Sequence, residues 1–150
     1  IIVSPKKNLI AAIELKSQIG SYGNNLNNRT EESLGSSEDF WTGFREHAFT
    51  CNQSPWLGYL MVVGKDKEST HAVKVSEPHF PVRAEFKNST YLDRYRILCQ
   101  RLVLEHKYNA VALIATENKN SYESLAENIS IDTFINSFRG YLLGLADEFK

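Results

Sequence analysis

Residues 10–18 constrain this chain more than any other part of its sequence. They open with four apolar residues, which predict a central β-strand buried on both faces, and Glu14 and Lys16 follow. Because side chains alternate along a strand with a period of two, Glu14 and Lys16 must point to the same side. A carboxylate and an ammonium beside a buried strand are costly unless something uses them. A divalent cation bridged to a phosphate is one such user, which indicates metal-dependent hydrolysis of phosphodiesters.

This pair is a weak signal on its own, because charged residues at alternate positions are common on exposed strand faces. One glutamate and one backbone carbonyl also make a poor Mg²⁺ site, so a second carboxylate is needed. Residues 5–8 have the composition of a turn and predict a β-hairpin, whose first arm would place that carboxylate just before Ile1. The chain starts in what resembles the interior of a strand, and we expect an N-terminal region to precede it.

Composition sets only broad limits on function. The chain has 150 residues, 42% of them hydrophobic and 23% charged, so we expect residues 1–150 to form a single domain with a substantial core. A net charge of −1 means that any DNA-binding surface must concentrate its basic groups locally. Cys51 and Cys99 lack the spacing of a metal site and are interpreted as buried thiols. No apolar run approaches the roughly 20 residues that span a bilayer, and no signal peptide is visible, so we expect no membrane partner and a cytoplasmic location.

The hydrophobic pattern alternates between strands and helices. Strands are predicted at residues 1–4, 9–16, 56–63 and 108–115, and helices at residues 31–49, 90–106 and 131–149. Thr30 and Ser89 are the expected N-caps of the first two helices. Residues 17–29 are predicted to form a polar loop, residues 69–88 an irregular segment and residues 117–128 a polar excursion. This order predicts an α/β domain with a mixed central sheet flanked by helices.

A run of amides follows the Glu14–Lys16 strand. Amide side chains suit adenine edges, and an arginine suits guanine edges or phosphate. A plain asparagine-rich turn is the alternative. Because the run directly follows the candidate catalytic strand, we take its members as candidate DNA contacts: Asn24, Asn25, Asn27, Asn28 and Arg29.

Three further side chains are candidates for support of the same site. Gln18 lies two residues beyond Lys16 on the same side of the strand. Glu31 and Glu32 would lend a third carboxylate from the start of a helix, or else they simply complement the helix dipole. The arginines of residues 90–106 are expected to form a solvated face, with contact to phosphate as the alternative.

Many separate blocks of this chain, in the same order, resemble the XhoI family of type II restriction endonucleases. The blocks are residues 11–18, 23–32, 39–42, 44–46, 55–60, 77–80 and 91–101. The likeness extends to about Thr116 and fades over residues 117–150. The resemblance implies a PD-(D/E)xK nuclease fold in which Glu14 is the second acidic position and Lys16 the catalytic lysine. It also implies a first acidic position immediately before Ile1 and family members that are considerably longer than this chain.

What the resemblance implies is a Mg²⁺-dependent type II restriction endonuclease of a restriction–modification system, cutting double-stranded DNA with CTCGAG as the family's preferred site. Glu14 and the Leu15 backbone carbonyl would hold the metal, and Lys16 would orient or help to deprotonate the attacking water. A palindromic target implies a homodimer. Two alternatives stay open: a structure-directed repair or junction-resolving nuclease of the same fold, and a DNA-binding remnant without catalysis. A purely structural protein leaves the Glu14–Lys16 pair without a purpose.

Overall fold

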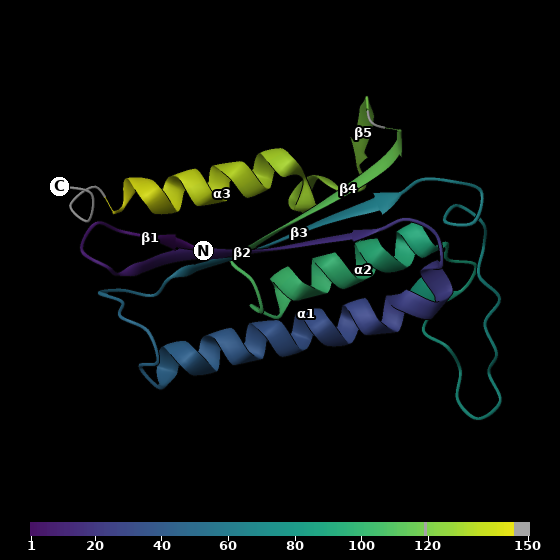
Figure 1. Ribbon diagram of the computed structural model, residues 1–150. Coiled ribbons are helices and arrows are strands. Elements are labelled where there is room, and N and C mark those ends of the chain that lie inside the picture. Colours follow the sequence, from purple (N-terminus) through teal and green to yellow (C-terminus); the bar gives the residue numbers. More distant parts are fainter. Residues whose placement is uncertain (119, 146–150) are drawn as a thin grey trace.

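The computed structural model describes residues 1–118 and 120–145. They form a five-stranded sheet between two layers of helices (Figure 1). Helices α1 and α2 cover one face of the sheet and α3 covers the other. The strands are β1 (Ile2–Val3), β2 (Leu9–Gln18), β3 (Trp56–Gly64), β4 (Ala110–Asn118) and β5 (Ser121–Ser124). The helices are α1 (Tyr22–Arg45), α2 (Tyr91–Leu104) and α3 (Ile131–Leu143), with 3₁₀ turns η1 (Ala84–Phe86) and η2 (Glu127–Ile129).

The sheet is mixed, and its strands are ordered β1-β2-β3-β4-β5. Strands β2, β3 and β4 are parallel, while β1 and β5 pair antiparallel at the two edges. Right-handed crossovers that add successive parallel strands in one direction place their helices on one face, which is why α1 and α2 lie together. The predicted α/β class, the mixed sheet and the N-terminal hairpin are therefore confirmed.

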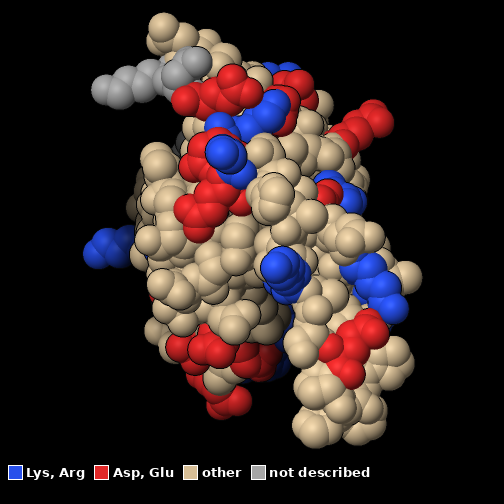
Figure 2. Space-filling view, turned by 90° about the vertical axis from the view of Figure 1, so that its right-hand side faces the viewer, with Lys and Arg blue, Asp and Glu red and all other residues tan. Residues whose placement is uncertain are grey.

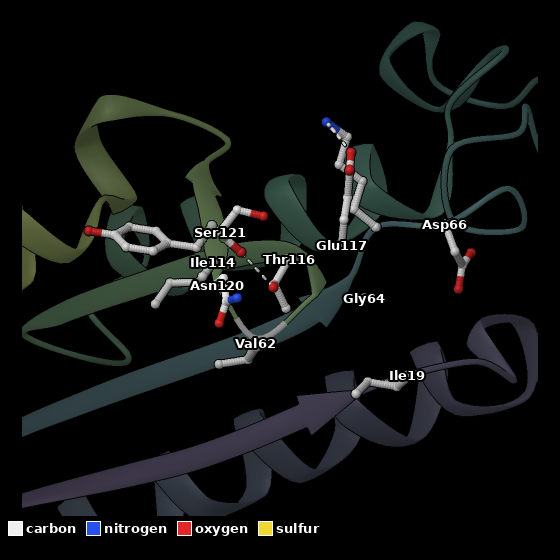
Figure 3. Close-up of a pocket in the computed structure, with 11 residues that line it drawn as sticks. Ile19, Val62, Gly64, Asp66, Ile114, Thr116, Glu117, Asn120 and Ser121 are labelled. Carbon is white, nitrogen blue, oxygen red and sulfur yellow. Dashed lines mark hydrogen bonds and ion pairs between the residues drawn. The ribbon is translucent and has the colours of Figure 1, made fainter.

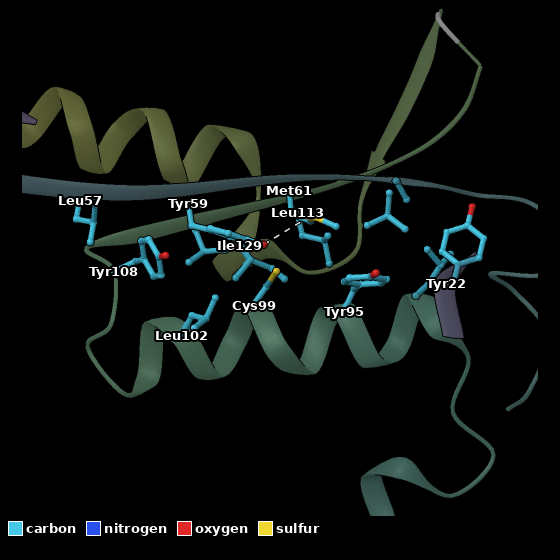
Figure 4. Packing of buried hydrophobic residues seen from close by; sticks show 14 residues of the cluster. Tyr22, Leu57, Tyr59, Met61, Tyr95, Cys99, Leu102, Tyr108, Leu113 and Ile129 are labelled. Atoms are coloured by element: carbon cyan, nitrogen blue, oxygen red, sulfur yellow. Dashed lines mark hydrogen bonds between the residues drawn. The ribbon is translucent and has the colours of Figure 1, made fainter. Parts of the chain in front are cut away.

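Buried side chains fill both faces of the sheet. On the α1/α2 face the largest are aromatic and carry a hydroxyl, namely Tyr22, Tyr59, Tyr95 and Tyr108 (Figure 4). On the α3 face Trp56 packs against Phe134 and Phe138, with ring centroids 5.1 and 4.7 Å apart. Cys99 is buried in the first of these cores, Cys51 is half-buried, and both are free thiols.

The predicted polar loop at residues 17–29 is wrong. Strand β2 continues to Gln18, and α1 begins at Tyr22, directly after a turn in which Ser21 has a φ of 49°. Thr30 lies inside the helix, where its hydroxyl donates to the Leu26 carbonyl, and does not cap it. Glycine and asparagine are weak helix formers, but burial of Tyr22 against the sheet outweighs that local preference. The same helix runs through Gly35 and ends at Arg45, short of the predicted residue 49.

Several other boundaries also differ from the prediction. Thr90, not Ser89, caps α2, and it forms a capping box with Asp93. Tyr108 precedes β4 instead of opening it. The polar excursion at residues 117–128 contains β5 and η2. Helix α3 ends at Leu143, and residues 146–149 of its predicted extent lie outside the described residues. Within the described ranges, no helix combines the length and the apolar character needed to cross a bilayer.

Candidate active site

Strand β2 presents Glu14 and Lys16 toward α1. The Lys16 Nζ lies 3.3 Å from Glu14 Oε1, and the two side chains are 26% and 17% exposed. Strand β1 pairs with β2 only as far as Ala11, so from Ala12 onward β2 pairs with β3 and, within the described residues, with no further strand.

Helix α1 supplies the opposite wall of the site. Glu32 Oε2 lies 3.1 Å from Lys16 Nζ and accepts a hydrogen bond from Arg29 Nη1 at 2.6 Å. One turn further along, Ser36 Oγ donates to Glu14 Oε1 at 3.3 Å. Positions 29, 32 and 36 share one face of the helix, so a single helix surface meets the strand.

Of the two adjacent glutamates, Glu32 is the one that reaches the site. Glu31 is exposed, and no hydrogen bond or ion pair to another described residue involves it. Because α1 starts at Tyr22, both glutamates lie in the middle of the helix, and neither is placed to complement its N-terminal dipole. The expectation that they open a helix is therefore wrong.

Tyr108 completes the cluster, and sequence reasoning did not single it out as a site residue. It lies 94 positions from Glu14 in the sequence, yet its buried hydroxyl donates to Glu14 Oε2 at 2.5 Å. The same hydroxyl lies 2.9 Å from the Ser33 carbonyl of α1. No periodicity or motif at this position could have indicated the contact, because the fold alone brings the segment before β4 to β2.

The charges in the cluster stabilise one another. Hydrogen bonding to Glu32, and then to Glu14, raises the pKa of Lys16 above its usual value against the opposing effect of burial. Hydrogen bonds from Arg29 and Lys16 lower the pKa of Glu32. Lys16 is therefore a protonated ammonium at neutral pH. Burial, and next the bond to Glu14, raises the pKa of Tyr108, which keeps its phenol protonated.

The amide run does not act as one surface, because it lies on helical turns. Asn25 and Arg29 share the face that meets β2, and the Asn25 amide donates to the Ser21 carbonyl. Asn24 and Asn28 are exposed on the outer side. Asn27 lines a hollow between α1 and α2. The six-residue run thus places its members on three sides of α1.

The remaining candidates have partners within the chain. Gln18 is buried at the end of β2, where its amide donates to the Gly20 carbonyl at 2.6 Å and braces the turn into α1. Arg94 Nε donates to Ser89 Oγ, Arg96 pairs with Asp93 at 3.4 Å, and Arg101 pairs with Glu85. These pairs match the solvated face expected for the arginines of α2.

A larger hollow of about 680 Å³ lies at the ends of β3 and β4, lined by Ile19, Val62, Ile114 and Thr116 among others (Figure 3). Val62 alternates with residues that face α2, so this hollow opens on the opposite side of the sheet from Glu14 and Lys16. Lys65 at its rim pairs with Glu117 and Glu123. Acidic and basic side chains are interspersed over this end of the molecule (Figure 2). Nothing in that arrangement favours a ligand of one charge.

The donor set beside Lys16 suits Mg²⁺. Glu14 and Glu32 offer carboxylate oxygens that converge on one ammonium. Mg²⁺ is usually bound by one or two carboxylates together with water and substrate phosphate, and seldom by a closed protein cage. The described residues contain no group of three His, Cys, Asp or Glu side chains that could form such a cage. Glu14 and Glu32 together would therefore fit a metal that is shared with a phosphate.

Fold and site together define an α/β protein with a carboxylate–lysine cluster where a strand of a mixed sheet meets a helix. The family described as restriction endonuclease XhoI matches residues 1–127. The chain belongs to this XhoI restriction endonuclease family, as the resemblance indicated.

Three curated relatives carry names of the same kind. The type II restriction enzyme BstVI of Geobacillus stearothermophilus is 48% identical over 137 residues, which is 88% of this chain and 61% of that protein. XhoI of Xanthomonas vasicola is 44% identical over 70% of this chain and 43% of its own length. AbrI of Azospirillum brasilense is 46% identical over 53% of this chain and 36% of its own length. The chain thus spans between 36% and 61% of these relatives, and no solved structure shows significant similarity to it.

Proposed function

We propose that this chain carries the catalytic centre of a type II restriction endonuclease that hydrolyses phosphodiester bonds of double-stranded DNA with Mg²⁺. The observation that carries the proposal is the convergence of Glu14 and Glu32 on Lys16, where β2 meets α1. Membership of the XhoI family and the names of the relatives support it.

In this proposal Glu14, Glu32 and the Leu15 backbone carbonyl hold the metal. When bound, Mg²⁺ polarises the phosphate and lowers the pKa of a coordinated water. Lys16 contributes a fixed positive charge that stabilises the developing negative charge on phosphorus oxygens and orients the water. Its raised pKa favours this role over that of a general base.

The geometry of the hairpin supports a further acidic ligand. Ile2 pairs with Ala11 in an antiparallel register, so a strand continued beyond Ile1 in the same direction would run along the open edge of β2 toward Glu14. We propose that a carboxylate on that path completes the metal site.

The DNA contacts that we propose lie on the first turns of α1. Exposed Asn24 and Asn28, with Asn27 beside them, offer amides to the duplex, while Asn25 and Arg29 lie next to the reacting phosphate. The target that we propose is CTCGAG. A palindrome is cut symmetrically by a homodimer in which each subunit cleaves one strand. A cytoplasmic location in a prokaryote belongs to the same proposal.

Cleavage of a mixed-sequence plasmid by the whole gene product tests the proposal. The assay compares Mg²⁺ with EDTA, and the unaltered protein with Glu14→Ala and with the matched control Glu31→Ala. Discrete fragments that require Mg²⁺, persist in the control and vanish in Glu14→Ala are expected. Fragments that follow DNA junctions or mismatches would indicate a structure-directed nuclease instead. A folded protein that shifts DNA without cutting it would indicate a binding remnant.

A further inference from the structure

Tyr108 has the geometry of a residue that holds Glu14 in place. Its side chain is buried before β4, and its ring packs on Tyr59 with centroids 5.2 Å apart (Figure 4). Its hydroxyl lies 2.5 Å from Glu14 Oε2 and 2.9 Å from the Ser33 carbonyl. One phenol therefore joins β2, α1 and the segment before β4 at the carboxylate.

The two oxygens of Glu14 have different surroundings. Oε2 accepts from Tyr108, whereas Oε1 faces Lys16 Nζ and Ser36 Oγ, each at 3.3 Å. A glutamate side chain loses considerable rotamer freedom when it is fixed, and a buried donor on one oxygen removes that freedom before any ligand binds. Only Oε1 is then presented toward the Lys16 side of the site.

We propose that Tyr108 is a positioning residue, whose hydroxyl holds Oε2 of Glu14 so that Oε1 is presented to a divalent cation as a single, oriented ligand. The inference rests on the proposed function and deepens it. Outer partners of this kind typically change metal affinity by about 10- to 100-fold when they are removed.

The chain offers a closely matched control. Tyr59 is also fully buried on the same face and touches the Tyr108 ring, but among the described residues its hydroxyl donates only to the weak acceptor Met61 Sδ, at 3.7 Å. Tyr108→Phe and Tyr59→Phe therefore remove the same atom from the same core. Only the first removes a hydrogen bond to Glu14.

Titration of the protein with Mg²⁺ alone, followed by calorimetry, is the decisive measurement. We expect Tyr108→Phe to weaken binding by about 10-fold or more, and Tyr59→Phe to leave it within about 2-fold. In cleavage assays the Mg²⁺ concentration for half-maximal rate should rise in the same proportion, while KM for DNA stays near that of the unaltered protein. Equal behaviour of the two variants, whether both unchanged or both impaired, would overturn the proposal.

A double-mutant cycle in urea keeps the test decisive even if Tyr108→Phe is unstable. The losses of stability from Tyr108→Phe and Glu14→Gln should be strongly non-additive, because the two side chains share a hydrogen bond. Tyr59 lies opposite Glu14 in the β2–β3 pairing but donates its hydroxyl to Met61, so the coupling of Tyr59→Phe with Glu14→Gln should be smaller. Equal coupling energies in the two cycles would contradict the inference. If the unaltered protein binds Mg²⁺ more tightly than Tyr108→Phe but cuts no DNA, the proposed function is wrong and the positioning role of Tyr108 stands. An unaltered protein that binds no Mg²⁺ would remove both.

Discussion

The two faces of the sheet are filled in different ways. Against α1 and α2, four buried tyrosines pack their rings into the core, and Tyr22 and Tyr108 donate their hydroxyls within it. Against α3, the buried aromatic residues are Trp56 and Phe134, which meet edge to face. A phenol combines a large apolar ring with a polar end, so it can line a polar site without loss of packing. The comparison teaches that both faces hold an apolar core, and that the α1/α2 face also joins its core to the charged cluster.

The side chains of strand β2 alternate between the two faces of the sheet. Glu14 and Lys16 point to the α1 side, whereas Ile13 packs with the α3 cluster and Leu15 is 69% exposed. Adjacent substitutions in this one strand should therefore have unlike consequences, which makes the difference between the faces testable.

The largest effect on stability is expected on the α3 face. Phe134→Ala removes a buried ring that packs against Trp56, and such changes typically cost about 3–5 kcal/mol. Urea unfolding should show that loss, while Mg²⁺ binding by the folded fraction stays unchanged. If the free energy of unfolding falls by less than about 1 kcal/mol, packing on the α3 face contributes little to stability.

The largest effect on cleavage is expected from Lys16→Met. Loss of an oriented charge at the reacting phosphate should lower kcat by about 10²- to 10³-fold. The nearby change Ile13→Val, on the other face, should stay within roughly 3-fold because Ile13 packs with the α3 cluster, away from the charged groups. Single-turnover rates on plasmid DNA measure both, and comparable losses would contradict the assignment of chemistry to one face.

Glu32→Gln should weaken Mg²⁺ binding, because Glu32 is a proposed ligand, and at saturating Mg²⁺ it should also alter the pH dependence of cleavage. Hydrogen bonding to Glu32 is the largest contribution that raises the pKa of Lys16, so its removal lowers that pKa. If the rate of cleavage depends on the protonated ammonium, it is constant at pH values below this pKa and falls as the pH rises through the pKa. The alkaline limb of the pH–rate profile should therefore move to lower pH in Glu32→Gln and stay in place in Glu31→Gln. If the alkaline limb does not move in Glu32→Gln, the ionisation that limits the rate is not that of Lys16.

The smallest effects are expected at the N-termini of α2 and α3, where a side-chain cap begins the helix on both faces of the sheet. Thr90 and Ser130 accept hydrogen bonds from the Asp93 and Thr133 backbone N–H groups, so each caps its helix. Replacement of either by alanine should cost about 1 kcal/mol in thermal unfolding. Both variants should keep the Mg²⁺ dependence of cleavage, and a change in only one would indicate that its helix acts on the site.

Much of the fold follows from local patterns. The Glu14–Lys16 strand, the strand at Trp56 and the mixed sheet were predicted because alternation and burial depend on near neighbours in the chain. The start of α1 was not predictable in the same way, since Gly23 and the asparagines disfavour a helix locally. Packing of Tyr22 beneath the sheet, with its hydroxyl on the Gly64 carbonyl, decides that start.

By itself the sequence determined the class of fold, the strand that carries Glu14 and Lys16 on one side, and the family to which the chain belongs. The tertiary structure alone decided that Glu32 and not Glu31 meets Lys16, and that Tyr108 reaches Glu14 from 94 positions away. Periodicity reports only which side of its own element a residue occupies. Which elements come within hydrogen-bonding distance is set by how the helices pack on the sheet, because that packing buries apolar area from the whole chain at once.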